Sequence, residues 1–396
     1  MTTPLRQINS IATADAAVVL LLMLGPATAA EVPDKAGPQT AMARLAAGMK
    51  PGQWAELKTE GLSMKVFSDG GHHALQYTDE AVWDPGSRQL FFCGEGHGAA
   101  PRFVKYTEST NRWTVLPLPN FAPVHAYDHQ AIDPLSGTYY RGRYYSREIQ
   151  QYNIKEGTWS KLTDIPASSG LGGSRITFGF EYFPEMRGLV VFLSAHGLYF
   201  YDIPKNQWRQ LAGKLGQYAY HKIARYNPVH KVVVFGGGND SKGYRSKDLW
   251  KLGASGQVTK LRAAPLPIGV TSTIFTVDPV SGKYLVFGRD KQAYEYDVTT
   301  DTWTELGGRP TNTPLSRFGR GVGREGTGQS EHEGAVGRPP EGPEPPIFTF
   351  GPDLKGSAVF GCVATPVSSH GVVMFVKYDR DKSKVFLYKH AAASER

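Results

Sequence analysis

Short runs of apolar residues, separated by turn residues, follow one another from about residue 50 to the end of the chain. They are rich in β-branched and aromatic types, and no long stretch shows the 3.6-residue period of a helix. One complete unit has four such runs, at residues 273–277, 283–287, 293–297 and 302–306. The pattern predicts antiparallel four-stranded sheets joined by tight turns.

The four-strand unit repeats roughly every 45 to 50 residues, which is typical of propeller blades. The last strand of each unit begins with Trp or Val and has Leu three positions later, and the copies begin at Trp54, Trp113, Trp159, Trp208, Val258 and Trp303. A second marker keeps step with the first: an Asp-Pro or Asn-Pro turn after the innermost strand, at Asp84, Asp133, Asn227 and Asp278, with weaker copies at Phe183 and Thr365. Two markers in register predict a β-propeller.

The first and last units complete each other. Residues 359–389 supply three strands, and the unpaired closing strand at residues 54–57 lies at the other end of the chain. Because a single sheet cannot cover both its faces, blades stack into a closed ring. We therefore predict an all-β, six-bladed β-propeller in which the N-terminal strand closes the last blade. Seven blades are the alternative, and would require strands within residues 308–356.

Glycine ends several second strands, as in Phe-Gly-Gly-Gly at 235–238 and Phe-Gly at 287–288, and Tyr-Glu-Tyr-Asp at 294–297 precedes Thr-Trp at 302–303. These motifs resemble kelch repeats, of the kind found in the central domain of galactose oxidase-like proteins. The resemblance implies the propeller fold. Kelch propellers include enzymes, sugar binders and protein scaffolds, so the fold does not assign a function.

The N-terminal segment indicates export. An apolar run at residues 17–30, too short to span a bilayer, follows Arg6 and ends in the small residues Ala27-Thr28-Ala29. We predict a signal peptide at 1–30, with an uncleaved anchor as the alternative, a linker at 31–49 and the propeller at 50–396. The mature protein is expected to be secreted or periplasmic, monomeric and without a membrane span.

A Gly- and Pro-rich insertion at residues 309–356 joins the fifth and sixth blades. A loop of this length is either functional, here as a lid over the ligand, or disordered. Two cysteines, Cys93 and Cys362, fall on neighbouring blades and form either a disulfide or two buried thiols. Zinc-type cysteine clusters are absent from the sequence.

The formal net charge is +8, from 44 Lys and Arg against 36 Asp and Glu. On an exported protein this excess favours an anionic polysaccharide partner, although a basic surface that only confers solubility explains it equally well. Nucleic acid is disfavoured, because no basic run with interleaved aromatic residues occurs.

Candidate chemistry gathers on one face. In a propeller, the segment before each innermost strand and the loop between its second and third strands open onto the same side, which we call the funnel face. The segments before innermost strands supply Tyr127, His129, Arg175, Tyr220 and His221, and the loops supply His97, Arg143, His196, Lys242 and Arg289. A single histidine at a strand start is more often structural than catalytic. Jointly these residues favour a site.

His, Tyr and Arg on one rim suit β-elimination on a uronate polysaccharide. A cation neutralises the carboxylate, a base removes the proton beside it, and an acid protonates the leaving oxygen. Arg175 or Arg143 would be the clamp, His129 or His221 the base, and Tyr127 or Tyr220 the acid. The set resembles propeller-type polysaccharide lyases, such as those acting on ulvan, and His97, Arg143, His196, Lys242 and Arg289 would bind substrate.

Other functions remain open. The runner-up is a non-catalytic glycan- or protein-binding kelch-like propeller of the cell envelope. A divalent metal could be held by His97, His129, His196 and His221, which would make it a cofactor of the same face. Glycoside hydrolysis needs paired carboxylates, and Glu80, Glu95 and Glu181 are candidates that would have to meet in three dimensions.

Overall fold

The computed structural model describes residues 39–67, 73–95, 100–120, 125–171, 177–216, 220–239, 246–288, 292–306, 361–379 and 382–390. The predicted signal peptide (1–30) and the predicted insertion (309–356) lie outside these residues. Residues 40–396 form one compact unit, and the fold below is that of this unit. Among the described residues, no helix is long and apolar enough to cross a membrane.

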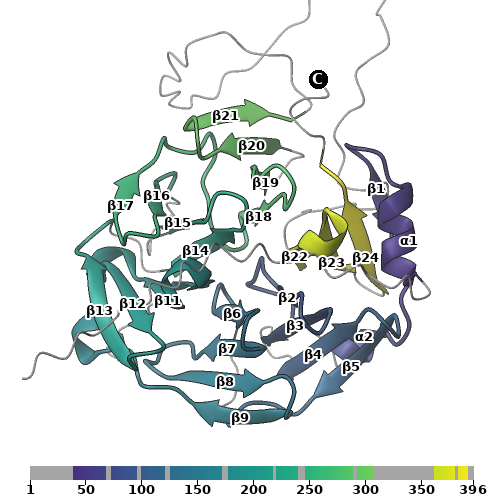
Figure 1. Ribbon diagram of the computed structural model, residues 1–396, viewed down its shortest axis with the longest axis horizontal. Helices are drawn as coiled ribbons and strands as arrows, with labels where there is room; N and C mark the ends of the chain where they lie inside the picture. Colours follow the sequence, from purple (N-terminus) through teal and green to yellow (C-terminus); the bar gives the residue numbers. More distant parts are fainter. Residues whose placement is uncertain are drawn as a thin grey trace, which may run out of the picture. The chain divides into compact units, whose positions relative to one another are not determined.

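Six four-stranded antiparallel sheets make up the unit (Figure 1). The first blade contains β2 (Val82–Asp84), β3 (Gln89–Gly94), β4 (Arg102–Thr107) and β5 (Arg112–Leu116), and the second contains β6 (Gln130–Asp133), β7 (Thr138–Gly142), β8 (Ile149–Asn153) and β9 (Thr158–Lys161). The third contains β10 (Gly179–Phe183), β11 (Gly188–Phe192), β12 (Leu198–Asp202) and β13 (Gln207–Ala212), and the fourth contains β14 (Tyr220–Asn227), β15 (Val232–Asn239), β16 (Leu249–Leu252) and β17 (Val258–Lys260). The fifth contains β18 (Thr273–Val277), β19 (Tyr284–Gly288), β20 (Ala293–Asp297) and β21 (Thr302–Glu305). The sixth contains β1 (Trp54–Glu56), β24 (Lys382–Tyr388), β23 (Val372–Asp379) and β22 (Cys362–Val367).

The innermost strands close a ring. Strands β2, β6, β10, β14, β18 and β22 each contact the next, and β22 contacts β2. Parallel bridges join the segments beside them, at Thr78–Tyr127, Asp128–Gly179 and Glu80–Ala364. The prediction of an all-β, six-bladed propeller is confirmed.

The N-terminal strand completes the last blade, as predicted. Strand β1 pairs with β24 in antiparallel register, and Trp54 lies opposite Tyr388 (Figure 1, purple beside yellow). The Trp54 ring stacks on Tyr388 at 4.6 Å between centroids and lies 4.9 Å from Phe375. Ring closure therefore depends on contacts between the two ends of the propeller.

The Asp-Pro and Asn-Pro turns recur for a local reason. The side chains of Asp84, Asp133, Asn227 and Asp278 each accept a hydrogen bond from a backbone N–H two or three residues later, at 2.8–3.3 Å. Such Asx turns fix the reversal between the first two strands. These turns gather at the face opposite the funnel, which we call the turn face.

Residues 41–48, which the sequence assigned to a linker, form helix α1 (Ala41–Gly48) instead. Thr40 caps it by accepting from the Ala43 N–H, and Met42 and Ala46 are buried in a core shared with β3 and β23. The alanine-rich composition that resembled a linker is also the best composition for a helix. Four one-turn 3₁₀ segments (Ala167–Ser169, Pro184–Met186, Ser194–His196, Ser368–His370) and the short helix α2 (Met64–Phe67) complete the elements.

Both cysteines are buried free thiols. Cys93 lies in the core between the first two blades, and Cys362 lies in the core between β19 and the last blade. Burial raises the pKa of Cys93 to about 12 and that of Cys362 to about 11. The thiol alternative of the sequence therefore holds in this structure.

Candidate functional site: the funnel face

The funnel face begins at residues with an unusual backbone. In or just before innermost strands, Tyr77, Tyr127, His221 and Thr271 have positive φ angles of 53°, 47°, 60° and 70°. This left-handed region disfavours residues other than glycine by about 1–3 kcal/mol each, most of all a β-branched one. Such strain persists where surrounding contacts fix the chain, and it is frequent at functional sites.

Hydrogen bonds between blades hold these positions. The Tyr127 N–H donates to the Tyr77 carbonyl at 2.8 Å, and the Thr78 hydroxyl donates to the Tyr127 carbonyl at 3.0 Å. The His221 N–H donates to the Thr177 hydroxyl at 3.0 Å, and its carbonyl accepts from the Val270 N–H at 3.2 Å. The funnel backbone is thus tied across successive blades, which orients the side chains that it carries.

Three of the predicted residues meet at this face with others. Tyr127 lies 5.7 Å from His221 and 5.2 Å from Tyr144 between ring centroids, and Tyr220 lies 6.2 Å from His221. Tyr77 stacks on His125 at 4.7 Å and lies 6.3 Å from His221. We call this set the funnel cluster: Tyr77, His125, Tyr127, Tyr144, Tyr220 and His221.

The hydroxyl groups of the funnel cluster converge. Burial raises the pKa of Tyr127 far above its usual value, and the nearby phenols of Tyr144, Tyr220 and Tyr77 raise it further. Tyr127 therefore keeps its proton at neutral pH. It can donate a hydrogen bond or a proton, and it is unsuited to act as a base.

His129 lies beside this cluster but points into the core. Its side chain is fully buried, its ring stacks on Phe178 at 3.8 Å, and its Nε2 accepts the Phe178 N–H at 3.1 Å. Burial, with the charges of Arg141 and Lys222, lowers the pKa of His129 well below its usual value. The His129 ring is therefore held neutral in the core, away from solvent.

The remaining predicted residues divide into two groups. Arg143 is exposed and pairs with Glu148 at 3.3 Å, and His196 is half-buried with its ring against Gly170. His97, Arg175, Lys242 and Arg289 lie outside the described residues. Within the described part of the chain, no three His, Cys, Asp or Glu side chains converge to hold a metal ion.

Below the funnel cluster, a set of charged residues fills the axis. The guanidinium of Arg225 donates to the Phe275 carbonyl at 2.9 Å and to Asp128, and lies 2.9 Å from Asp79 and 3.2 Å from Glu80. Asp128 also accepts the backbone N–H groups of Phe180 and Ala224. With Glu181, which interacts electrostatically with Glu80 and Arg225, we call this set the axis cluster.

Sequence reasoning named Glu80 and Glu181 as candidate carboxylates, but it missed Arg225, which joins the axis cluster, and Tyr77, although signals existed. Glu181 and Arg225 each interrupt an innermost strand two positions before its turn, where apolar residues are expected. Tyr77 lies seven positions before Asp84, as Thr271 lies before Asp278. That spacing marks the left-handed funnel position in both blades.

Comparison with known proteins supports the fold. No protein-family model matches the chain, and no curated protein matches it. A crystal structure of a protein of unknown function from Bacteroides thetaiotaomicron VPI-5482 is similar, with a TM-score of 0.52 and 9% identity over 85% of this chain and 76% of that one. TolB from Acinetobacter baumannii has a TM-score of 0.40 and 13% identity over 57% of this chain and 53% of its own. The first likeness shows the fold alone.

Proposed function

We propose that this propeller is an exported polysaccharide lyase that cleaves a uronate-containing polysaccharide by β-elimination at the funnel cluster. The observation that carries the proposal is the contact between Tyr127 and His221. A phenol that stays protonated and a half-buried imidazole lie side by side on strained, cross-linked backbone. An acid and a base held in one place are what the elimination requires.

In this mechanism His221 removes the proton at C5 of the uronate. The C5–H electron pair forms the C4–C5 double bond, the C4–O4 bond breaks, and the leaving oxygen takes the proton of Tyr127. Arg143 releases Glu148 and pairs with the uronate carboxylate, which stabilises the charge that develops beside C5. Tyr77, Tyr144 and Tyr220 offer hydroxyls and ring faces to the sugars.

The test is ultraviolet absorbance over time with polygalacturonate, alginate and ulvan, with and without chelator. The unsaturated product absorbs, so a rising trace is expected with at least one substrate. His221→Ala and Tyr127→Phe should each lower kcat by about 10²–10⁴-fold. His230→Ala, on the turn face, is the matched control and should leave the rate unchanged. Flat traces with every substrate would overturn the lyase proposal.

The second candidate is carbohydrate binding without turnover. The stack of Tyr77 on His125 and the four phenols of the funnel cluster favour it, because aromatic faces and hydroxyls bind sugars without acid-base chemistry. It fits the kelch resemblance and the predicted export equally well. Saturable binding of the same polysaccharides with flat absorbance, weakened in Tyr77→Ala, would select this function.

A further inference from the structure

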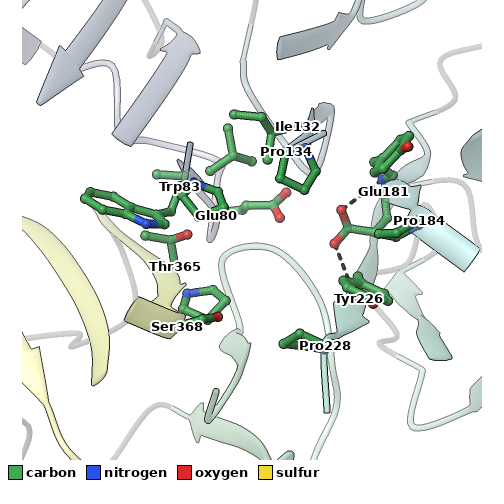
Figure 2. A pocket seen from close by; sticks show the side chains of 15 residues that line it. Glu80, Trp83, Ile132, Pro134, Glu181, Pro184, Tyr226, Pro228, Thr365 and Ser368 are labelled. Carbon is green, nitrogen blue, oxygen red and sulfur yellow. Dashed lines mark hydrogen bonds between the residues drawn. The ribbon is translucent and has the colours of Figure 1, made fainter. Parts of the chain in front are cut away.

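The turn face holds a cavity that the funnel chemistry does not use. Its volume is about 180 Å³, and it is lined by prolines of the turns, aromatic side chains and two carboxyl groups. Figure 2 shows Glu80 and Glu181 pointing toward each other across this space. Drug-sized sites are larger, roughly 300–1,000 Å³, so the cavity suits a small ligand.

Glu80 enters the cavity with an unsatisfied oxygen. Its side chain is 6% exposed, and its Oε2 lies 3.2 Å from Arg225 without a hydrogen-bond partner among the described residues. Glu80 lines the cavity, and its carboxyl group points into it (Figure 2). A buried carboxylate with free acceptor capacity is costly unless a donor or a cation reaches it.

The axis cluster is short of positive charge. Asp79, Glu80 and Asp128 all pair with Arg225. Glu181 feels the charge of Arg225 but forms no ion pair with it among the described residues. Glu181 accepts the N–H groups of Tyr182 at 2.9 Å and Tyr226 at 2.8 Å, so its orientation toward the cavity is fixed by backbone. A second cation would balance the carboxyl groups that Arg225 does not.

We propose that the cavity at the turn face binds a small organic cation, an ammonium or guanidinium group on an apolar stem, between Glu80 and Glu181. The charged head donates to Glu80 and to the acceptor capacity that Glu181 keeps beside its two backbone N–H donors, and the stem packs on Pro134, Pro184 and Pro228. An apolar wall around two converging carboxylates distinguishes such a ligand from a hydrated metal ion, which needs several oxygen ligands.

Binding is coupled to proton release. Burial raises the pKa of Glu181 to about 7 and that of Glu80 well above its usual value; Arg225 lowers both, and Asp128 raises both. Glu181 and Asp79 also raise the pKa of Glu80, and the Tyr182 and Tyr226 N–H groups lower that of Glu181. A cation between the carboxylates favours their charged forms, so affinity should rise from pH 5 to pH 8.

The experiment is titration calorimetry with n-butylammonium and n-butylguanidinium, using n-butanol and butyrate as neutral and anionic controls. We expect saturable binding of at least one cation and none of either control. Glu80→Gln and Glu181→Gln should each weaken binding by at least about tenfold. Glu156→Gln, at an exposed turn, is the matched control and should bind like the wild type.

A second variant covers the case in which a carboxylate variant fails to fold. Ser368 is exposed and lines the cavity, so Ser368→Trp should block the entrance without touching either carboxylate. Loss of binding in this variant supports the proposal. Absence of cation binding to the wild type, equal binding of n-butanol, or unchanged affinity in both Glu80→Gln and Ser368→Trp would overturn it. Each outcome is independent of polysaccharide cleavage at the funnel.

Discussion

At the funnel end of the axis, Tyr127 and His221 lie among phenols and imidazoles on a left-handed backbone, whereas at the turn end Glu80 and Glu181 lie among prolines. The funnel cluster is neutral apart from any protonated histidine. The axis cluster has four carboxyl groups and one guanidinium. The same six strands therefore carry two different chemistries at their two ends.

The difference follows from how each end is built. Funnel side chains come from the start of innermost strands, from the segments before them and, for Tyr144, from the loop after β7. At Tyr127 and His221 the backbone is left-handed and hydrogen-bonded between blades. Of the axis-cluster carboxylates, Glu80 and Asp128 lie at bridges and Glu181 lies in β10, where strain is small and the cost is desolvation. The funnel positions carry strained backbone and the axis-cluster carboxylates carry buried charge, and the two costs respond to different perturbations.

Removal of the Arg225 guanidinium should have the largest effect. Arg225→Met leaves Asp79, Glu80 and Asp128 without their counter-ion, and breaking a buried pair in this way costs about 3–5 kcal/mol. The measurement is the free energy of unfolding by urea. Arg112→Met, which removes an exposed pair with Glu60 at 2.7 Å, should cost less than about 1 kcal/mol. Equal losses in the two variants would show that the axis cluster does not stabilise the fold.

The pH dependence of the unfolding free energy should reveal the contribution of the axis-cluster carboxyl groups. Folding raises the pKa of Glu181 from 4.5 to about 7, so the folded protein binds more protons than the unfolded chain between these values. The unfolding free energy of the protein should therefore fall as pH rises from 4.5 to 7, and Glu181 should contribute no more than about 3 kcal/mol to this decrease. Glu181→Gln should make this decrease smaller when urea unfolding is measured across the same pH range.

Other groups set the limits of that window. Glu108, bonded to His370 and Arg88, has a pKa lowered to about 2, so its contribution is lost as pH falls from 4.5 to 2. Burial lowers the pKa of Lys222 to about 7, which makes stability rise between pH 7 and 10.5. A difference between wild type and Glu181→Gln that is constant from pH 4.5 to 7 would contradict the assignment to Glu181.

The sequence predicted the propeller because its markers act locally. The Asx turns at Asp84 and Asp133 form within a few residues, and Trp54 closes a blade through a neighbouring strand. Helix α1 was not predicted because a linker and an alanine-rich helix have similar compositions. The N-capping residue Thr40 was the sequence signal that could have indicated the helix.

The sites were harder to predict because their residues meet only after ring closure. Tyr127 and His221 belong to the second and fourth blades. They occupy equivalent positions before the turns at Asp133 and Asn227, which spacing could indicate. Glu80 and Arg225 occupy positions that are not equivalent in their blades, so no repeat rule pairs them. The His129 ring points to the core because it stacks on Phe178, which comes from the next blade. The sequence near His129 does not indicate this contact.

A comparison of two histidines sharpens the boundary of the funnel. His129→Ala removes a buried ring and should cost about 2–4 kcal/mol of unfolding free energy. His221→Ala removes a half-buried ring, so we expect a loss of at most about 1 kcal/mol with a much larger loss of turnover. Urea unfolding and initial rates measure both quantities. If His129→Ala kept wild-type stability and lost turnover, the mechanism would have to include His129.

The smallest effect tests the strain itself. Thr271 is a β-branched residue at φ 70°, a conformation that glycine adopts without cost, so Thr271→Gly relieves strain while it removes a small side chain. Thr259, exposed in β17, has no such strain, and Thr259→Gly should lose about 1 kcal/mol in strand preference and backbone entropy. We expect the unfolding free energy of Thr271→Gly to equal or slightly exceed that of the wild type. If Thr271→Gly lost as much unfolding free energy as Thr259→Gly, the contacts of the Thr271 side chain would outweigh the strain of its backbone. Backbone strain would then not distinguish the funnel end from the turn end, and only their side chains would.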